Sequence, residues 1–323
     1  MNAAPPVSVC LVTYNRARLL PKTLDSVQAQ SFADFEFIIS DDCSTDNTQE
    51  ICLEYARYDP RIKYFRNERN LGMPGNLNAS LQKAQGNSLA NLHDGDFYRV
   101  DLLAKWKEAL DNAATAGFVF NAYQVSNDDG TIKIYREHYP PLIPGHELVR
   151  RLLSQWTSCV SGTVMARRSL YEQMGWFDSK FGNFSDVDMW LRIAMMHDVA
   201  YVNEPLIDLM PRDPLRFYAF VHWQVALWIL GIHVLNLQRC RHLLPGLVEK
   251  LQRQYQWRRF KYLMMHMLLC IKHRRWDRVR EGLIIWRDSD DRILKILGYL
   301  FGRVEHKPNW YSSDLWKTAI LGI

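Results

Sequence analysis

Closely spaced cysteine pairs are absent from this sequence. No two of the six cysteines form a C-x-x-C pattern, which argues against a zinc knuckle or a redox-active pair. The opening segment, residues 1–6, lacks the charged-then-apolar layout of a secretory signal, so we expect a cytoplasmic location. The longest apolar stretch, 225–237, is interrupted by polar residues. It falls short of the ~20 residues that a membrane-spanning helix needs.

A recurring unit is also missing. No segment repeats three times, so a solenoid is unsupported. The segment Thr13 to Arg16, which follows the first apolar run, contains no glycine. This counts against a sugar nucleotidyltransferase, a class that usually opens with a glycine-rich triphosphate loop. What is present is a chain of 323 residues with 48% hydrophobic composition, enough for one large domain or two ordinary ones.

Charge is divided unevenly along the chain. Residues 1–210 carry 20 Lys and Arg against 26 Asp and Glu, a net of −6, whereas residues 211–323 carry 20 against 9, a net of +11. Seven of the 11 tryptophans also follow residue 210. We therefore predict a boundary near Met210, with a domain over 1–210 and a basic, Trp-rich helical domain over 211–323.

Strand and helix patterns alternate four times in the first third of the chain. The strands are continuous apolar runs, typical of buried parallel strands, and the helices have apolar residues at helical spacing. The expected strands are 7–12, 35–40, 62–65 and 87–92, and the expected helices are 19–29, 48–56, 75–84 and 99–113. This alternation predicts an α/β fold whose strand-end loops gather at one edge of the sheet.

The pattern changes after residue 117. A hairpin is expected from strands 118–125 and 131–135, which flank an Asn-Asp-Asp-Gly turn. A strand over 160–166 and a helix over 186–196 are expected next. From residue 215 onward helical patterns dominate, including a helix, a short basic turn and a second helix over 266–286.

Two carboxylates one residue apart stand where the fourth strand ends. Asp94 and Asp96 repel each other unless a cation or a proton lies between them. A hard divalent ion takes oxygen ligands and also binds phosphates, and ligands of open α/β sheets bind beyond the carboxyl ends of the strands. A metal–diphosphate site is therefore the leading interpretation. An Asp-Gly turn without function is the alternative.

Four segments, in chain order, resemble family 2 glycosyltransferases and together span about 7–210. Val7 to Arg16 (VSVCLVTYNR) is similar to their first strand, and Asp41 to Thr48 (DDCSTDNT) to their D-D-x-S-x-D-x-T loop. Asp94-Gly95-Asp96 stands in the place of their metal-binding D-x-D. Ser185 to Arg192 (SDVDMWLR) resembles the E-D-x-D-L-W-L-R segment that carries their catalytic base. Residues 211–323 lie outside the resemblance.

The resemblance implies a GT-A fold, a Rossmann-like mixed and mostly parallel sheet between helices, followed here by an all-helical region. It also implies an inverting transfer of sugar from a UDP- or dTDP-linked donor to a glycan or lipid-linked saccharide in bacterial-type surface polysaccharide synthesis. Asp186 would be the general base, and Asp96 with Asp94 would hold Mg²⁺ or Mn²⁺ on the diphosphate. The residues expected to bind the donor are Thr13, Tyr14, Asn15, Arg16, Asp41, Asp42, Asn76, Asp94 and Arg212.

Two positions depart from the family pattern. His93 stands where the family often has Asp, which leaves the set of metal ligands open. Ser185 stands where it has Glu, which bears on how the base is oriented. Two other acids have ordinary structural interpretations, because Asp188 can pair with Arg192 one turn later and Asp46 can cap a turn. Trp156 and Trp176 are expected to pack in the core, with stacking on a sugar ring as the alternative.

Other functions remain open at this stage. A non-catalytic nucleotide-sugar-binding or scaffold module would fit the two departures, and a sugar nucleotidyltransferase would use a related fold. A two-carboxylate glycosidase would leave the Asp41-Asp42 loop unexplained. The basic segment over 258–280 is by default a solvated helix face. Contact with an anionic membrane surface is the sharper interpretation, and nucleic-acid binding ranks last because no nucleic-acid motif accompanies the charge.

Overall fold

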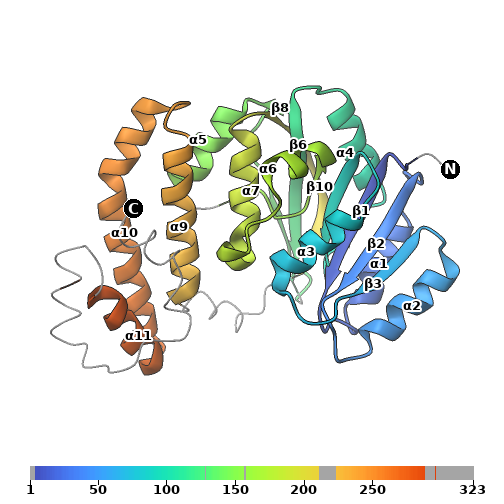
Figure 1. Cartoon of the computed structure of the whole chain (residues 1–323), viewed down its shortest axis with the longest axis horizontal. Helices are drawn as coiled ribbons and strands as arrows, with labels where there is room; N and C mark the ends of the chain where they lie inside the picture. Colours follow the sequence, from blue (N-terminus) through green and yellow to red (C-terminus); the bar gives the residue numbers. More distant parts are fainter. Residues whose placement is uncertain (1–3, 128, 156–157, 211–222, 288–294, 296–323) are drawn as a thin grey trace. The chain divides into compact units, whose positions relative to one another are not determined.

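A computed structural model describes residues 4–127, 129–155, 158–210, 223–287 and 295 (Figure 1). The chain divides into two compact units, Met1–Pro211 and Arg212–Ile323. The first unit holds one ten-stranded sheet with flanking helices, and the second is helical wherever its elements are described. The predicted α/β fold followed by a helical region is confirmed.

The first half of unit 1 alternates strands and helices as the apolar pattern predicts. The elements are β1 (Val7–Thr13), α1 (Leu20–Gln28), β2 (Phe35–Asp41), α2 (Thr48–Tyr58), β3 (Ile62–Arg66), α3 (Gly72–Lys83), β4 (Ser88–His93), β5 (Phe97–Tyr98) and α4 (Leu102–Asp111). β1 and β2 are buried along their whole length, because helices cover both faces of a parallel sheet.

The second half of unit 1 is less regular. It comprises β6 (Ala116–Ser126), β7 (Ile132–Tyr135), β8 (Leu142–Ile143), α5 (Gly145–Gln155), β9 (Val164–Arg167), α6 (Arg168–Met174), the 3₁₀ helix η1 (Ser179–Phe184), α7 (Ser185–Ala194) and β10 (Asp198–Leu209). The predicted hairpin is confirmed, since β6 and β7 pair antiparallel. The strand expected over 160–166 begins only at Val164, because Gly162 has a positive φ of 88° that breaks an extended strand.

The strand order is β3-β2-β1-β4-β9-β6-β10-β5, with β7 added beside β6 and β8 beside β10. The sheet is mixed, and its longest ladders are parallel: β6 with β10, β1 with β2, and β1 with β4. The carboxyl ends of β1, β2 and β4 therefore meet at one edge, as predicted. Thr13 is in register with Asp41, and Val12 with His93.

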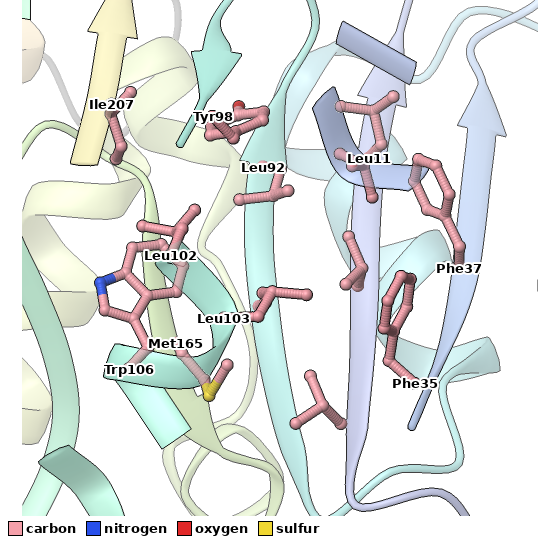
Figure 2. Packing of buried hydrophobic residues seen from close by; sticks show 14 of the residues in the cluster. Leu11, Phe35, Phe37, Leu92, Tyr98, Leu102, Leu103, Trp106, Met165 and Ile207 are labelled. Atoms are coloured by element: carbon pink, nitrogen blue, oxygen red, sulfur yellow. The ribbon is translucent and has the colours of Figure 1, made fainter. Parts of the chain in front are cut away.

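Alternate residues of the strands supply two apolar layers. On one face Val7, Val9 and Leu11 pack with the buried side chains of α1 and α4, among them Trp106 (Figure 2). The Trp106 indole N–H donates to Asn121 Oδ1 at 3.0 Å, so its polar atom is satisfied inside the core. On the other face Phe118 of β6 lies 5.1 Å, ring to ring, from Trp190 of α7. Both layers position the strand ends that bear the site.

Unit 2 contains α9 (Trp223–Arg239), α10 (Pro245–Lys272) and α11 (Trp276–Arg287). The predicted basic turn is confirmed at residues 273–275, between α10 and α11, and Arg274 has a positive φ of 54° there. The inner side of α10 contacts its neighbours: His266 lies 4.8 Å, ring to ring, from Trp223 of α9. None of the helices in the described part of the chain combines the length and the apolar character needed to cross a bilayer.

Candidate active site

The loops after β1 and β2 are joined by backbone and side-chain hydrogen bonds. The Asp42 N–H donates to the Thr13 carbonyl (2.9 Å), and the Asn15 N–H donates to Ser44 Oγ (2.9 Å). Asn15 Oδ1 in turn accepts from the Thr45 N–H (2.8 Å). Asn15 itself has a φ of 52°, a conformation that Asn tolerates better than most residues. The first two predicted loops therefore form one surface.

Asp41, at the end of β2, is fully buried, and its carboxylate holds the β2 loop in place through hydrogen bonds. Its Oδ1 accepts from both the N–H and the hydroxyl of Ser44 (2.9 and 2.5 Å), and its Oδ2 accepts from the Tyr64 hydroxyl (2.7 Å). Burial, followed by the bond to Asp41, raises the pKa of Tyr64, so this phenol remains a donor. Arg66 Nε lies 3.8 Å from the same carboxylate. Direct contact between Asp41 and a nucleotide stays a prediction.

Asp42 and Asn76 share a second network under the same loop. Asp42 Oδ1 accepts from Asn67 Nδ2 (3.0 Å) and from the Leu71 N–H (2.8 Å). The buried Asn76 accepts from Ser40 Oγ (2.7 Å) and donates to the Ser40 carbonyl (2.9 Å). In this arrangement Asn76 ties α3 to β2. Its predicted contact with a nucleobase remains untested, as does that of Asp42.

The third loop, after β4, reaches the first through an ion pair. Arg16 Nε lies 3.6 Å from Asp94 Oδ1, and both side chains are largely shielded from solvent. Gly95 has a φ of 91°, which favours glycine, and its N–H donates to Thr23 Oγ1 (3.0 Å). The Thr23 hydroxyl donates to the Asp96 carbonyl (2.8 Å). Helix α1 therefore holds the turn that presents both carboxylates.

Asp96 also touches the end of β10. Its Oδ1 accepts from the Met210 N–H at 3.4 Å, and the Cγ of Met210 lies 3.9 Å from the position that a Cβ on Gly95 would take. Within the described residues no three His, Cys, Asp or Glu side chains gather as a metal centre. Mg²⁺ in phosphate-binding enzymes takes one or two carboxylates and completes its shell with substrate phosphates and water. Asp94 and Asp96 fit that requirement.

Asp186 and His93 both lie close to Gly162. A Cβ built on Gly162 would lie 3.0 Å from Asp186 Oδ2, 3.5 Å from His93 Cε1 and 3.6 Å from His93 Nε2. These values put the carboxylate of Asp186 in α7 and the imidazole at the end of β4 around the same point beside Gly162. The Asn91 amide donates to the Gly162 carbonyl (3.3 Å), which anchors this glycine to β4. The edge of the sheet therefore brings Asp186 beside the Asp94-Asp96 loop.

Helix α7 places Asp186 in its first turn, where the helix dipole favours a carboxylate. The predicted structural pair is confirmed: Arg192 Nε donates to the fully buried Asp188 at 2.9 Å. Arg192 also donates to the carbonyls of Met174 and Trp176, so α7 is fixed to the preceding turn. Asp188 points into the unit, and Asp186 is the acid that faces the site.

Two further groups have pKa values with clear causes. Burial, followed by the negative charge of Asp96, raises the pKa of Tyr98 well above its ordinary value. Tyr98 therefore stays protonated and donates to the His93 carbonyl (2.8 Å). Burial of Asp46 is outweighed by bonds from Thr48 and from the Ala17 N–H, which lower its pKa. The predicted capping role of Asp46 is confirmed, since it accepts from the Thr48 N–H at the start of α2 (3.1 Å).

Sequence patterns did not identify several groups at this edge. Gly162, Thr23, Tyr98 and the Met210 N–H lie in separate elements, and only their contacts with the acidic loops single them out. The sole signal for Gly162 was a Ser-Gly pair before a strand. Arg212 and Trp156 lie outside the described residues. Trp176 is half-buried, with its ring parallel to that of Tyr171 and the centroids 6.3 Å apart, so its place in the core stays a prediction.

Comparison with known proteins supplies independent findings. A family model described as glycosyl transferase family 2 matches residues 8–175. The chain is 38% identical over 209 residues to a putative teichuronic acid biosynthesis glycosyltransferase, TuaG, of Bacillus subtilis, a match covering 64% of this chain and 79% of that one. It is 26% identical over 199 residues to an Escherichia coli protein, UDP-Glc:alpha-D-GlcNAc-diphosphoundecaprenol beta-1,3-glucosyltransferase WfgD, covering 61% and 73%.

A solved structure gives the same architecture. The mannosyltransferase PcManGT of Pyrobaculum calidifontis, in complex with GDP-Man and Mn²⁺, superposes with a TM-score of 0.54 at 18% identity. The match covers 83% of this chain and 76% of that one. At this level of identity the likeness concerns the fold, which is the GT-A arrangement of a mixed sheet between helices.

Proposed function

The chain belongs to glycosyl transferase family 2, and from this membership we propose that it inverts the anomeric centre of a nucleotide-sugar while transferring the sugar to an acceptor hydroxyl. Family membership makes the chain a glycosyltransferase. The stereochemistry, the donor, the acceptor and the residue roles are the content of the proposal.

One observation carries the assignment of roles. The imidazole of His93 and the carboxylate of Asp186 both lie against Gly162, while Arg16 and Asp94 link the β1 loop to the β4 loop. Acids from two separate stretches of chain, Asp94 after β4 and Asp186 of α7, thus lie at one edge of the sheet. This arrangement supports the proposed transfer, because an acceptor hydroxyl that attacks a donor bound at the first loops would need a base beside that donor, as Asp186 of α7 would be.

The donor half of the site would lie between the β1 and β2 loops. Thr13 and Tyr14 would line the base and ribose pocket, and Asp42 would accept a hydrogen bond from the nucleobase or ribose. Tyr14 is 45% exposed, so its ring is available to a ligand. Asp41 and Asn76 would keep this pocket in shape through the buried networks described above. Asn15 and Arg16 would contact the donor beside the Asp94 loop.

Asp96, with Asp94, would hold Mg²⁺ or Mn²⁺ on the diphosphate, where the ion would offset the charge of the leaving group. A structural neighbour in complex with GDP-Man and Mn²⁺ supports a divalent ion. The Arg16 guanidinium lies 3.6 Å from Asp94 Oδ1 and so brings a positive charge to the loop that bears both carboxylates. Arg212 is proposed to reach the same diphosphate.

Asp186 would take the proton from the acceptor hydroxyl as the oxygen attacks the anomeric carbon. The bond from that carbon to the diphosphate breaks as the new glycosidic bond forms, through an oxocarbenium-like state. Attack from the face opposite the leaving group inverts the configuration and requires no enzymic nucleophile. The first-turn position of Asp186 stabilises its charged form before the reaction.

We propose a lipid-linked saccharide or growing glycan as acceptor, in the synthesis of a bacterial surface polysaccharide, and a UDP- or dTDP-sugar as donor. Support comes from the names of relatives, one of which uses UDP-Glc and a diphosphoundecaprenol-linked sugar and another of which takes part in teichuronic acid synthesis. A cytoplasmic enzyme that works at the membrane face would meet such an acceptor.

The test is transfer from a panel of nucleotide-sugars with Mn²⁺, comparing the wild-type protein with Asp186→Asn. We expect the variant to bind the donor normally and to lose at least about a hundredfold in kcat, the scale of general base catalysis. Glu172→Gln, an exposed acid on α6, is the matched control and should transfer normally. Normal transfer by Asp186→Asn would remove Asp186 as the base. Donor binding without turnover by the wild-type protein on many acceptors would favour the scaffold alternative.

A further inference from the structure

Helix α10 has apolar residues on two opposite sides. Its inner side packs within unit 2, where Leu263, His266 and Cys270 are buried. On its other side Trp257 is 58% exposed, Met265 50%, Leu268 59% and Ile271 42%. A helix of one globular unit ordinarily turns a polar face to solvent, so this second apolar face needs a partner.

The exposed residues form one stripe along the helix. We define the outer face of α10 as Trp257, Lys261, Met265, Leu268, Ile271 and Lys272. Successive members are mostly three or four residues apart, the spacing that puts side chains on the same side of a helix. The stripe is about 21 Å long at ~1.5 Å per residue over 257–271. At its end stands Trp276, which is also 58% exposed.

Positive charge accompanies this face. Lys250, Lys261 and Lys272 of α10 are exposed, whereas Arg259 is buried, and the one acidic residue of the helix is Glu249. The ammonium of Lys261 lies 5.2 Å from the ring centre of Trp257, so cation and aromatic ring occupy the same patch. The following turn adds His273 and Arg274, both exposed. A partner that complements such a face has an apolar region bordered by negative charge.

We propose that the outer face of α10 binds the interface of an anionic lipid bilayer. Apolar side chains with Trp among them enter the boundary between headgroups and acyl chains, while lysines beside them contact the phosphates. Lys261 and Lys272 belong to this face. A lysine in such a place can lay its aliphatic chain on apolar surface and keep its ammonium group in water. A second copy of the chain would be repelled by the same cations on its own face.

This proposal rests on the proposed function, because a lipid-linked acceptor lies in a membrane. Lipid binding is measured without donor or acceptor, so its failure is distinguishable from a failure of transfer. The full-length protein is sedimented with phosphatidylcholine vesicles, with or without one-third phosphatidylglycerol. We expect binding to the anionic vesicles that weakens as salt is raised. The double variant Trp257→Ser and Leu268→Ser should bind more than tenfold more weakly, since both side chains are exposed and their loss leaves the core intact.

The matched control is Leu53→Ser with Tyr58→Ser, which removes two exposed apolar residues from α2 in unit 1. Its binding should equal that of the wild-type protein. A second variant, Lys261→Gln with Lys272→Gln, should lose the preference for anionic vesicles.

Three results overturn the proposal: no binding by the wild-type protein, equal binding by the α10 and α2 double variants, or a dimer in light scattering that the Trp257 and Leu268 substitutions abolish.

Discussion

At the scale of single residues, a glycine controls how closely Asp186, the proposed base, can approach the β4 loop. Gly162 has a φ of 88°, and the space where a Cβ would stand is bounded by Asp186 Oδ2 at 3.0 Å and His93 Cε1 at 3.5 Å. A larger residue is strained there, and it also pushes on two site side chains. Gly162 therefore affects both backbone geometry and the position of Asp186.

Gly162→Ala should lower kcat by at least tenfold with a smaller change in donor affinity. The added methyl displaces Asp186 from the acceptor, and misplacement by about 1 Å can cost ~100-fold in rate. Steady-state kinetics and donor titration separate the two effects. Gly130→Ala is the control, because Gly130 has a φ of 80° with no atom within 4 Å of its Cβ position. Equal kinetics for both variants would contradict a role for Gly162 at the site.

Residue roles divide into those that local sequence predicts and those that only the fold reveals. The Asp188–Arg192 pair and the Asp46 cap follow from spacing within one element, and both were predicted. Asp41 was expected to lie beside a ligand, yet its carboxylate is occupied by Ser44 and Tyr64, one of them from a different strand. No local pattern carries that information, because the contact depends on how β2 and β3 align.

At the scale of elements, a second cluster holds the opposite edge of the sheet. Glu36, near the start of β2, accepts from Ser8 Oγ of β1, from the Gln85 N–H before β4 and from Lys63 Nζ of β3, each at 2.6 Å. The Gly86 N–H donates to Ser8 Oγ (2.8 Å). The carboxylate of Glu36 in β2 thus connects β1, β3 and the segment just before β4, at the end of these strands that is away from the site.

This cluster predicts a particular acid sensitivity. Burial raises the pKa of Glu36, but bonds from Lys63, Ser8 and Gln85 outweigh it and leave the pKa below its ordinary value. A carboxyl whose pKa is lower in the folded state stabilises the fold above the unfolded value of ~4.3. That stabilisation is lost as the pH falls through the folded pKa.

Glu36→Gln should therefore lower the free energy of unfolding at pH 7 by about 1–3 kcal/mol, the cost of losing a buried charge-assisted hydrogen-bond partner. The melting temperature should fall with it. The difference from the wild-type protein should shrink as the pH falls below about 4. Thermal melts at a series of pH values measure this, with Glu54→Gln, an exposed acid on α2, as control. A difference that stays constant from pH 7 to pH 3 would show that the Glu36 charge does not stabilise the fold.

Elements with a strong apolar pattern were predictable, and those shaped by tertiary contacts were not. β1, β2 and α2 begin at or near their expected residues because each has a clear run or helical spacing. Helix α5 and strand β10 were missed. β10 has register shifts near Pro205, so its apolar residues do not alternate cleanly. Only glycine fits at position 145, at the start of α5, because the Ala194 and His197 carbonyl oxygens occupy the position that a Cβ would take.

At the scale of the whole molecule, charge is separated between the two units. The acidic residues gather in unit 1, where the loop after β4 carries Asp94 and Asp96, which we propose hold a divalent cation, and the basic excess lies in residues 212–323. The change in composition near Met210 predicted a boundary, and the chain divides between Pro211 and Arg212. The family resemblance ended at the same place, so the role of unit 2 rests on its own surface.

We propose that acids from separate loops serve one metal-bound donor, and calorimetric titration of the donor with and without Mn²⁺ measures the contribution of the β4 loop. The wild-type protein should bind the nucleotide-sugar at least about tenfold more tightly with Mn²⁺, or ~1.4 kcal/mol. Asp96→Asn should lose this gain while keeping its fold. An Asp96→Asn protein that binds the donor with the full Mn²⁺ gain would contradict the account, because the carboxylates at the end of β4 would then play no part in holding the diphosphate.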